Sequence, residues 1–181
     1  MAGPTRAELD AARHRRVRDV IAPDLRVVFC GINPGLYSAW TGHHFAKAGN
    51  RFWPVLHLSG FTPRILAPSE KHEMLGLGLG VTNVVMRATA TAAELSPEEL
   101  VAGGRRLVAK MNRYRPRFLA ILGIGAYRSA FGRPKAVIGR QPESIGNTQL
   151  WVLPNPSGLN ANYQKDELSR LFGELRVASD A

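Results

Sequence analysis

The sequence predicts a single α/β domain with three layers, α/β/α, and a mainly parallel central sheet. Short apolar runs rich in β-branched residues alternate with longer segments that start at helix-capping residues. Because this alternation is typical of strand–helix–strand units, we expect parallel strands with helices on both faces. The 181 residues are enough for one substantial core. No repeat, low-complexity tract or linker divides the chain, so residues 1–181 are interpreted as one domain.

The first twenty residues are predicted to form either a basic helix or a loose basic arm. Thr5 and Glu8 fit a capping box, so residues 7–20 can continue as a helix that carries four arginines. A strand is expected over residues 26–30. The segment 31–49 then shows little periodicity, and a stretch of this kind is more often a functional loop than a plain connector.

The remaining elements are predicted from capping residues, which start helices, and from β-branched runs, which form strands. The helix that begins at Ser96 has the clearest start, because Pro97 takes its first position and Glu99 its third. Its weakest point is Gly103-Gly104. In chain order, these elements are a helix over 51–58 capped by Asn50, a helix over 69–75, a strand over 81–86, the helix from Ser96 to about Tyr114, a strand over 117–122, a helix over 126–131, a strand over 150–153 and a helix over 165–177.

The charge balance favours a polyanionic partner. The chain has 24 Lys and Arg residues against 14 Asp and Glu residues, a net charge of +10. Most of the excess is Arg, which suits bidentate phosphate contacts but would also arise from an Arg-rich proteome. A field of this sign attracts nucleic acid, which is therefore the first interpretation.

Several other kinds of site have little support in the sequence. One cysteine, Cys30, excludes a disulfide framework and a metal site of several thiolates. His43 and His44 are adjacent and poorly placed to share one metal ion. Gly123-Ile124-Gly125 lacks the third small residue of the dinucleotide fingerprint, although a nucleotide-binding enzyme that uses this turn stays an alternative. We therefore expect no metal and no cofactor.

The first residues carry no long apolar segment and are strongly basic. A secretory signal and a membrane span both need such a segment. We therefore expect no membrane association, and a cytoplasmic, nucleoid-associated location.

Two loops of related composition follow two of the predicted strands. Gly31-Ile32-Asn33-Pro34-Gly35 follows the strand over 26–30, and Asn155-Pro156-Ser157-Gly158-Leu159 follows the strand over 150–153. In an open α/β sheet, ligands bind at the carboxyl ends of the strands. Each loop taken singly would also suit a plain turn, since Asn, Pro and Gly are turn residues. The pair together predicts an active site built from backbone donors and one neutral amide side chain.

Further short motifs accompany these two loops. They are Thr41-Gly42, Phe45-Ala46, Asn50-Arg51-Phe52-Trp53, Gly80-Val81-Thr82-Asn83 and Leu153-Pro154. Together with the loops, they resemble the motifs of the mismatch-specific uracil-DNA glycosylases and of the related thymine-DNA glycosylases. The resemblance covers nearly the whole chain from about Asp24 onward, and it implies a uracil-DNA glycosylase-like fold.

The resemblance implies a DNA-repair enzyme. Such an enzyme excises uracil from G·U mismatches in double-stranded DNA by flipping the base and hydrolysing its N-glycosidic bond, which leaves an abasic site. We expect it to be monofunctional and monomeric, with thymine and other damaged bases left open as substrates. Its partner would be double-stranded DNA that contains a mismatched or damaged base. The alternative is a non-catalytic DNA-binding protein that only inspects flipped bases.

The resemblance also places the substrate pocket between the two loops. Asn33 would hold the attacking water below the sugar C1′, because an amide has no pKa suited to a general base. A carboxylate such as Glu94 or Asp24 is left open as an assisting group. The expected substrate-binding residues are Ile32, Ser38, Phe45, Asn83, Asn155 and Ser157, with Phe45 stacking on the flipped base.

The resemblance also implies that Gly158-Leu159-Asn160, in the second loop, form the wedge that fills the duplex. Leu159 is apolar and of a size to enter the space left by the flipped base, as intercalating side chains do. The backbone of Gly158 and Asn160 would contact the guanine left behind, which explains a preference for mismatches. The enteric bacterial members carry an arginine close after this leucine, whereas Asn160-Ala161-Asn162 follow here. One cation beside the wedge is therefore missing.

Overall fold

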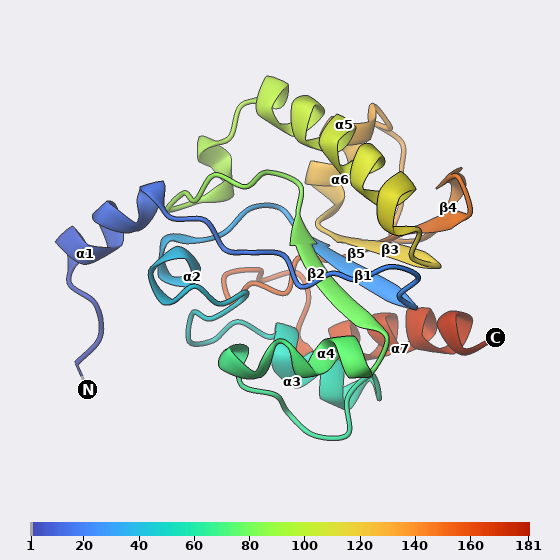
Figure 1. Ribbon diagram of the computed structural model, residues 1–181, viewed down its shortest axis with the longest axis horizontal. Coiled ribbons are helices and arrows are strands. Elements are labelled where there is room, and N and C mark those ends of the chain that lie inside the picture. The colour runs from blue at the N-terminus through green and yellow to red at the C-terminus, as the bar shows by residue number, and fades with distance from the viewer. Residues whose placement is uncertain (1) are drawn as a thin grey trace.

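The computed structural model describes residues 2–181 and has a five-stranded sheet at its centre (Figure 1). Met1, the first residue of the predicted domain and basic segment, lies outside the described residues. The strand order is β2-β1-β3-β5-β4, and within this sheet β4 alone runs antiparallel to its neighbour. The strands are β1 (Val27–Gly31), β2 (Leu79–Asn83), β3 (Phe118–Leu122), β4 (Gly139–Ile145) and β5 (Thr148–Leu153). The predicted α/β/α fold with a mainly parallel sheet is confirmed.

Helices cover both faces of the sheet and enclose two separate apolar cores (Figure 1). One face carries α5 (Pro97–Tyr114) and α6 (Ile124–Phe131), and the other carries α3 (Phe52–Leu58), α4 (Glu73–Gly76) and α7 (Lys165–Asp180). The other helical segments are α1 (Arg6–Ala11), α2 (Leu36–Thr41) and the 3-10 turns η1 (Ala12–His14), η2 (Pro68–Glu70) and η3 (Ala92–Glu94).

The central strand β1 is buried on both sides because its residues alternate between the two cores. Val27 and Phe29 belong to the core under α3 and α7, whereas Val28 and Cys30 belong to the core under α5. Phe29 also meets Phe52 of α3 edge to face, with ring centroids 5.5 Å apart. This double burial fixes where β1 ends and where the loop after it begins.

The amino-terminal segment differs from both predicted forms. Helical structure ends at His14, and the chain then runs to Val20, which forms an antiparallel bridge with Val81 of β2. Arg15 has extended backbone angles, with φ −87° and ψ 148°, and residues 15–20 contain no helical turn, so this part of the chain is extended. Val17 and Val20 are buried, whereas Arg18 between them is exposed. The predicted helix over 7–20 is therefore wrong beyond His14. The segment is docked on the fold, so it is not a loose arm either.

Three elements of the described chain are absent from the sequence-based prediction. They are α2, which lies inside the segment 31–49, the short 3-10 turn η3, and β4. β4 is an edge strand of mostly polar residues and contains Pro142, which only an edge strand tolerates. It therefore lacks the apolar run that marks the inner strands. The predicted helix over 69–75 is split into η2 and α4, and the other elements agree to within three residues at each end.

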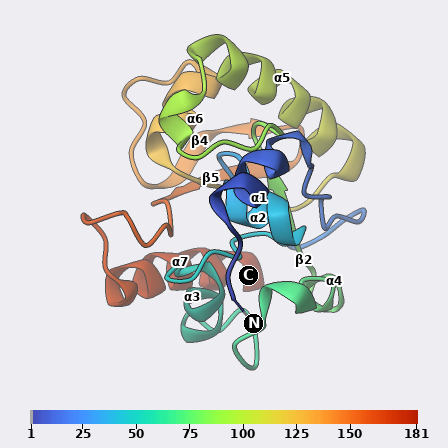
Figure 2. The ribbon, with the colours of Figure 1, turned by 90° about the vertical axis from the view of Figure 1, so that its left-hand side faces the viewer.

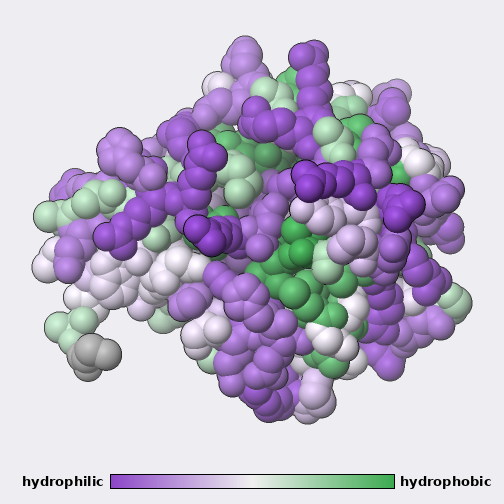
Figure 3. Space-filling view, in the orientation of Figure 1, coloured by the Kyte–Doolittle hydropathy of each residue, from purple (hydrophilic) through white to green (hydrophobic). Residues whose placement is uncertain are grey.

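Hydrophilic side chains cover most of the surface seen in Figure 3, with limited hydrophobic areas between them. Within residues 2–181, no helix combines the length and the apolar composition that crossing a membrane requires.

Gly103 lies where α5 crosses the chain that leaves β2. A Cβ added at Gly103 would lie 2.4 Å from the backbone oxygen of Val84. We expect Gly103→Ala to destabilise the protein by about 1–3 kcal/mol in urea unfolding, because α5 must shift to relieve this contact. Gly173→Ala, in the middle of α7, is the matched control, since a Cβ there meets nothing within 4 Å. The control should gain about 1 kcal/mol from helix propensity, and an equal gain at Gly103 would contradict the assigned packing.

Candidate active site

A cavity of about 230 Å³ lies at the carboxyl ends of the parallel strands. Figure 2 views this edge of the sheet, with α1 and α2 in front and the loop after β5 beside them. The loops after β1, β2 and β5 line the cavity, together with the segment between α2 and α3. The two Asn-Pro loops therefore meet across one cavity, as expected at this edge of an open sheet. The predicted site residues that line it are Ile32, Asn33, Ser38, Phe45, Asn83, Asn155, Ser157 and Leu159.

Asn33 has an amide whose orientation is fixed by its neighbours. Its Nδ2 donates to the Arg87 carbonyl at 2.9 Å and to Thr89 Oγ1 at 2.7 Å. The Thr89 hydroxyl donates its own proton to the Thr91 carbonyl at 2.7 Å, so toward Asn33 it can only accept. Both contacts therefore require that the NH₂ group of Asn33, and not its oxygen, faces Arg87 and Thr89. The Asn33 Oδ1 accepts no hydrogen bond from residues 2–181 and stays available to a ligand.

Asn83, at the end of β2, has an amide nitrogen without a partner. The residue is 4% exposed, and within residues 2–181 nothing accepts a hydrogen bond from its Nδ2. Gly31 pairs with it in the sheet and leaves room for its side chain: a Cβ at Gly31 would lie 2.5 Å from Asn83 Oδ1. A buried amide left unpaired costs about 1–3 kcal/mol. A ligand that supplies an acceptor here would recover this cost.

Phe45 lies in the cavity wall with a strained backbone. Its φ is 52°, a left-handed value that is rare for a bulky side chain. Its ring centroid lies 4.1 Å from that of Phe52, with the planes inclined by 31°. The next N–H, of Ala46, donates to Ser38 Oγ at 3.2 Å and ties the segment to α2. The Phe45 N–H itself has no hydrogen-bond acceptor among the described residues, so the wall offers an aromatic face and a free donor.

The second loop is folded on its own polar groups. Asn155 Oδ1 accepts from the Ser157 N–H at 3.0 Å, and Ser157 Oγ accepts from the Leu159 N–H at 3.3 Å. Asn160 Nδ2 donates to the Asn155 carbonyl at 3.0 Å. Leu159 is 82% exposed at the rim of the cavity. Gly158 and Asn160 lie in the same loop but outside the cavity lining.

Neither candidate carboxylate reaches the cavity, and no Asp or Glu lines it. Glu94 accepts from the Thr91 N–H at 2.8 Å and from Arg13 at 3.1 Å, and these bonds lower the pKa of Glu94. Its role is to cap η3. Asp24 precedes β1, at the opposite end of the sheet, and pairs with Arg115 at 3.7 Å. Across residues 2–181, no three His, Cys, Asp or Glu side chains are grouped so as to hold a metal ion.

His44 lines the cavity as a neutral side chain. It is 2% exposed, and its Nε2 lies 2.9 Å from the Arg18 carbonyl, which can only accept. Burial lowers the pKa of His44 to about 4. The Arg18 carbonyl and Asp19 favour the charged form, whereas Lys71 and His43 oppose it. At neutral pH this imidazole therefore carries no positive charge into the cavity.

Several cavity residues were not predicted: Pro34 and Asn50 lie in recognised motifs but were given no role there, and the others follow no motif. Thr89 and the residues after it belong to a loop without periodicity or turn signal, and only its position after a strand could have indicated it. Lys47 adds the exposed ammonium group of the lining. The main lining residues absent from the prediction are Pro34, Lys47, Asn50, Thr89 and Leu122.

The neutral state of His44 makes stability depend on pH. The unfolded chain binds a proton near the ordinary His pKa of about 6.5, while the folded chain does not until about pH 4. The contribution of His44 is therefore complete above the unfolded pKa and is lost as pH falls toward the folded one. We therefore expect protonation of His44 to lower the unfolding free energy by about 2 kcal/mol between pH 7 and pH 5. The His44→Gln variant should not show this fall.

Urea titrations at pH 7 and pH 5 measure this difference. His14→Gln is the control, because His14 is exposed, and it should keep the wild-type fall. The assignment of His44 as a buried neutral group is wrong if both variants show the same pH dependence.

The geometry agrees with what comparisons with known proteins show. The Uracil DNA glycosylase superfamily matches residues 18–176 of the chain. A solution NMR structure from Methanosarcina acetivorans, provisionally named a uracil DNA glycosylase, matches with a TM-score of 0.58 and 19% sequence identity. That match covers 90% of this chain and 98% of the other, and it supports the fold. The matched region includes both Asn-Pro loops and all the described residues of the cavity wall, so this chain belongs to the uracil DNA glycosylase superfamily.

Proposed function

We propose that this protein is a monofunctional glycosylase that removes uracil from G·U mismatches in double-stranded DNA. The family supports action on DNA and glycosidic chemistry. The observation that carries the finer proposal is the amide of Asn33, which is held by Arg87 and Thr89 so that its oxygen alone is left for a ligand. An oxygen that can only accept suits a water molecule, which it would orient toward the C1′ of a bound nucleotide.

The cavity offers the groups that a uracil ring needs. The ring has an aromatic face, and its edge presents a carbonyl acceptor beside an N–H donor. Phe45 supplies a face for stacking, and the free amide of Asn83 supplies a donor and an acceptor side by side. A uracil bound between them would satisfy the unpaired Nδ2 of Asn83. These two residues are proposed to recognise the base.

Bond cleavage would proceed without a charged acid or base. The C1′–N1 bond breaks with its electron pair leaving on the uracil, which gives a uracil anion and an oxocarbenium-like sugar. The free N–H of Phe45 is a candidate donor to the anion. Water held by Asn33 adds to C1′ and gives up a proton, for which the uracil anion is an acceptor. The products are free uracil and an abasic site.

Access to a base within a duplex would depend on the second loop. A paired base lies inside the stack and must be flipped before it reaches the cavity. Leu159 is exposed at the cavity rim, so its side chain is free to enter the space that the base leaves. The net charge of +10 favours the phosphate backbone on either side. Since one chain supplies every group of the cavity, we also propose that the protein acts as a monomer.

The role of Asn33 is tested by its alanine variant. We expect Asn33→Ala to lower the single-turnover rate of uracil release from a G·U duplex by about a hundredfold or more, because no other cavity group replaces its free oxygen. Binding to the same duplex should stay within about threefold, since the base contacts remain. Alkaline cleavage of the labelled strand at the abasic site measures the rate.

Asn147→Ala is the matched control, because Asn147 is an exposed asparagine in the turn between β4 and β5. Wild-type activity in the Asn33 variant would overturn the assigned chemistry. Tight binding by the wild type with no base release from G·U, G·T or A·U duplexes would instead favour the base-inspecting binder.

The lack of a carboxylate among the described residues that line the cavity gives a pH prediction. No carboxylate lines the cavity, and burial holds the pKa of His44 at about 4. We expect the single-turnover rate at saturating enzyme to change by less than about threefold between pH 5.5 and 8. A tenfold fall toward the acid end with a single ionisation would show that a carboxylate or a histidine assists after all.

A further inference from the structure

The loop that carries Leu159 is held in place by one side chain from a distant part of the chain. Arg51 directly precedes α3, and its guanidinium donates to the carbonyls of Asn160 at 3.1 Å and of Gly158 at 3.3 Å. The same group bonds the Tyr163 carbonyl. The Arg51 backbone N–H donates to a fourth carbonyl of this segment, that of Pro156, at 2.9 Å.

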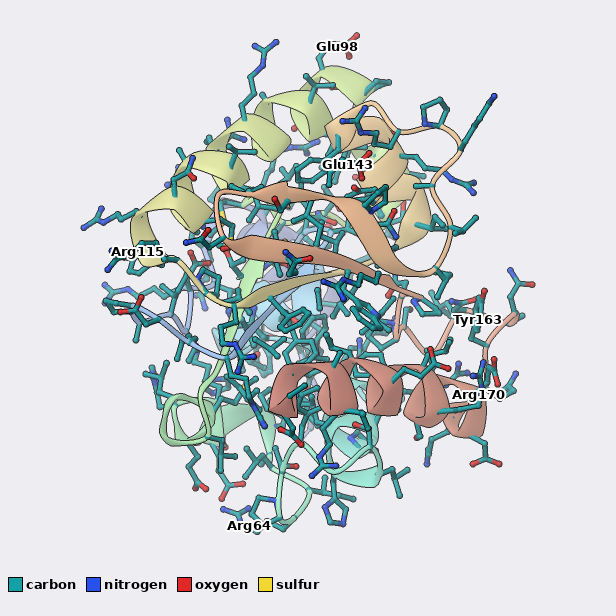
Figure 4. The ribbon with its side chains drawn as sticks, turned by 90° about the vertical axis from the view of Figure 1, so that its right-hand side faces the viewer. Arg64, Glu98, Arg115, Glu143, Tyr163 and Arg170 are labelled. Carbon is teal, nitrogen blue, oxygen red and sulfur yellow. The ribbon has the colours of Figure 1, made fainter. Side chains whose placement is uncertain are left out.

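These bonds join the loop to a distant part of the chain, whereas the loop bonds described above lie within the loop itself. Residues 154–163 contain no helix or strand, and Leu159 itself is exposed. Tyr163 lies where the loop joins α7, as Figure 4 shows, so Arg51 links the tip of the loop to its end. An ordered loop is needed because a flexible one would lose its conformational entropy each time it entered a duplex.

The loop also packs closely against the chain just before Arg51. A Cβ added at Gly158 would lie 2.6 Å from the carbonyl oxygen of Gly49, so the two backbones approach to a distance that only glycine permits. Arg51 forms no ion pair with a carboxylate in residues 2–181, and its side-chain hydrogen bonds all go to carbonyls of this loop. A guanidinium suits this task, since its planar fork carries five donors in fixed directions.

We propose that Arg51 is a positioning residue that holds the Leu159 loop in the shape required to open a base pair. The inference rests on the proposed glycosylase function and adds a residue outside the cavity lining. Arg51 acts through Leu159, so it affects the flipping of a paired base and leaves the later cleavage step unchanged. The fall in the rate of uracil release when Arg51 is replaced should therefore depend on how firmly the target base is held in the duplex.

The test compares two duplexes with the same flanking sequence. In one the uracil faces guanine, and in the other it faces an abasic-site analogue, where no pairing has to be broken. We expect Arg51→Met to lower the single-turnover rate on the G·U duplex by roughly tenfold or more, and on the unpaired uracil by less than about threefold. Activity on the unpaired uracil also shows that the variant is folded.

A double variant separates positioning from a general structural effect. If Arg51 acts only through Leu159, then Leu159→Ala and the pair Arg51→Met/Leu159→Ala should have the same rate on G·U within about twofold. Arg128→Met is the matched control: Arg128 also clamps a loop carbonyl, that of Ala136, but at the far end of α6. It should keep the wild-type ratio between the two duplexes.

Three outcomes would overturn the proposal. Equal losses on both duplexes would show that Arg51 supports the fold or the cleavage step, and an unchanged G·U rate would show that the loop does not need it. Additive losses in the double variant would show that Arg51 acts independently of Leu159. A wild-type protein that releases uracil from neither duplex would instead refute the proposed function, and this inference with it.

Discussion

The parallel pairing of β1, β2, β3 and β5 is the constraint on which the site depends. In this register Gly31 lies beside Asn83, and Leu122 lies beside Leu153, so separate chain segments leave the sheet at one edge. Because alternate residues of each inner strand are buried in different cores, a slip of one position would exchange their faces. The two apolar cores therefore fix the register, and the register fixes how the Asn-Pro loops face each other.

Apart from the exposed ammonium group of Lys47, the polar side chains of residues 2–181 that line the cavity are neutral at pH 7. His44 is kept uncharged by burial, Glu94 is used as a helix cap, and Asn33 has an amide where a carboxylate would act as a base. In the proposed mechanism, stabilisation of a departing anion would then come from oriented N–H groups rather than from proton transfer. Such a mechanism would rely on the leaving ability of the base itself. Selection between bases would depend on how well each base fits against Phe45 and Asn83 and on the free-energy cost of flipping it out of the duplex.

The fold class and both Asn-Pro loops were predictable because their signals are local: an apolar run, then Asn, Pro and Gly. The motifs also identified the superfamily, whereas the mismatch-specific branch stays a prediction. The missed parts depend on contacts between distant residues. Val20 is extended because it pairs with Val81, and Thr89 became a site residue only because Asn33 lies beside it. The polar edge strand β4 has no apolar run, and the carbonyls that Arg51 binds lie more than a hundred positions away.

The most direct test is a structure of the protein bound to a duplex that carries 2′-fluoro-2′-deoxyuridine opposite guanine. The fluorine disfavours an oxocarbenium-like sugar, so the base should stay attached. We expect the uracil ring against Phe45, its edge at the Asn83 amide, a water on Asn33 Oδ1 and Leu159 inside the duplex. A uracil that remains stacked in the helix while the protein is bound, with the cavity empty of base, would contradict the assignment of this cavity as the site of excision.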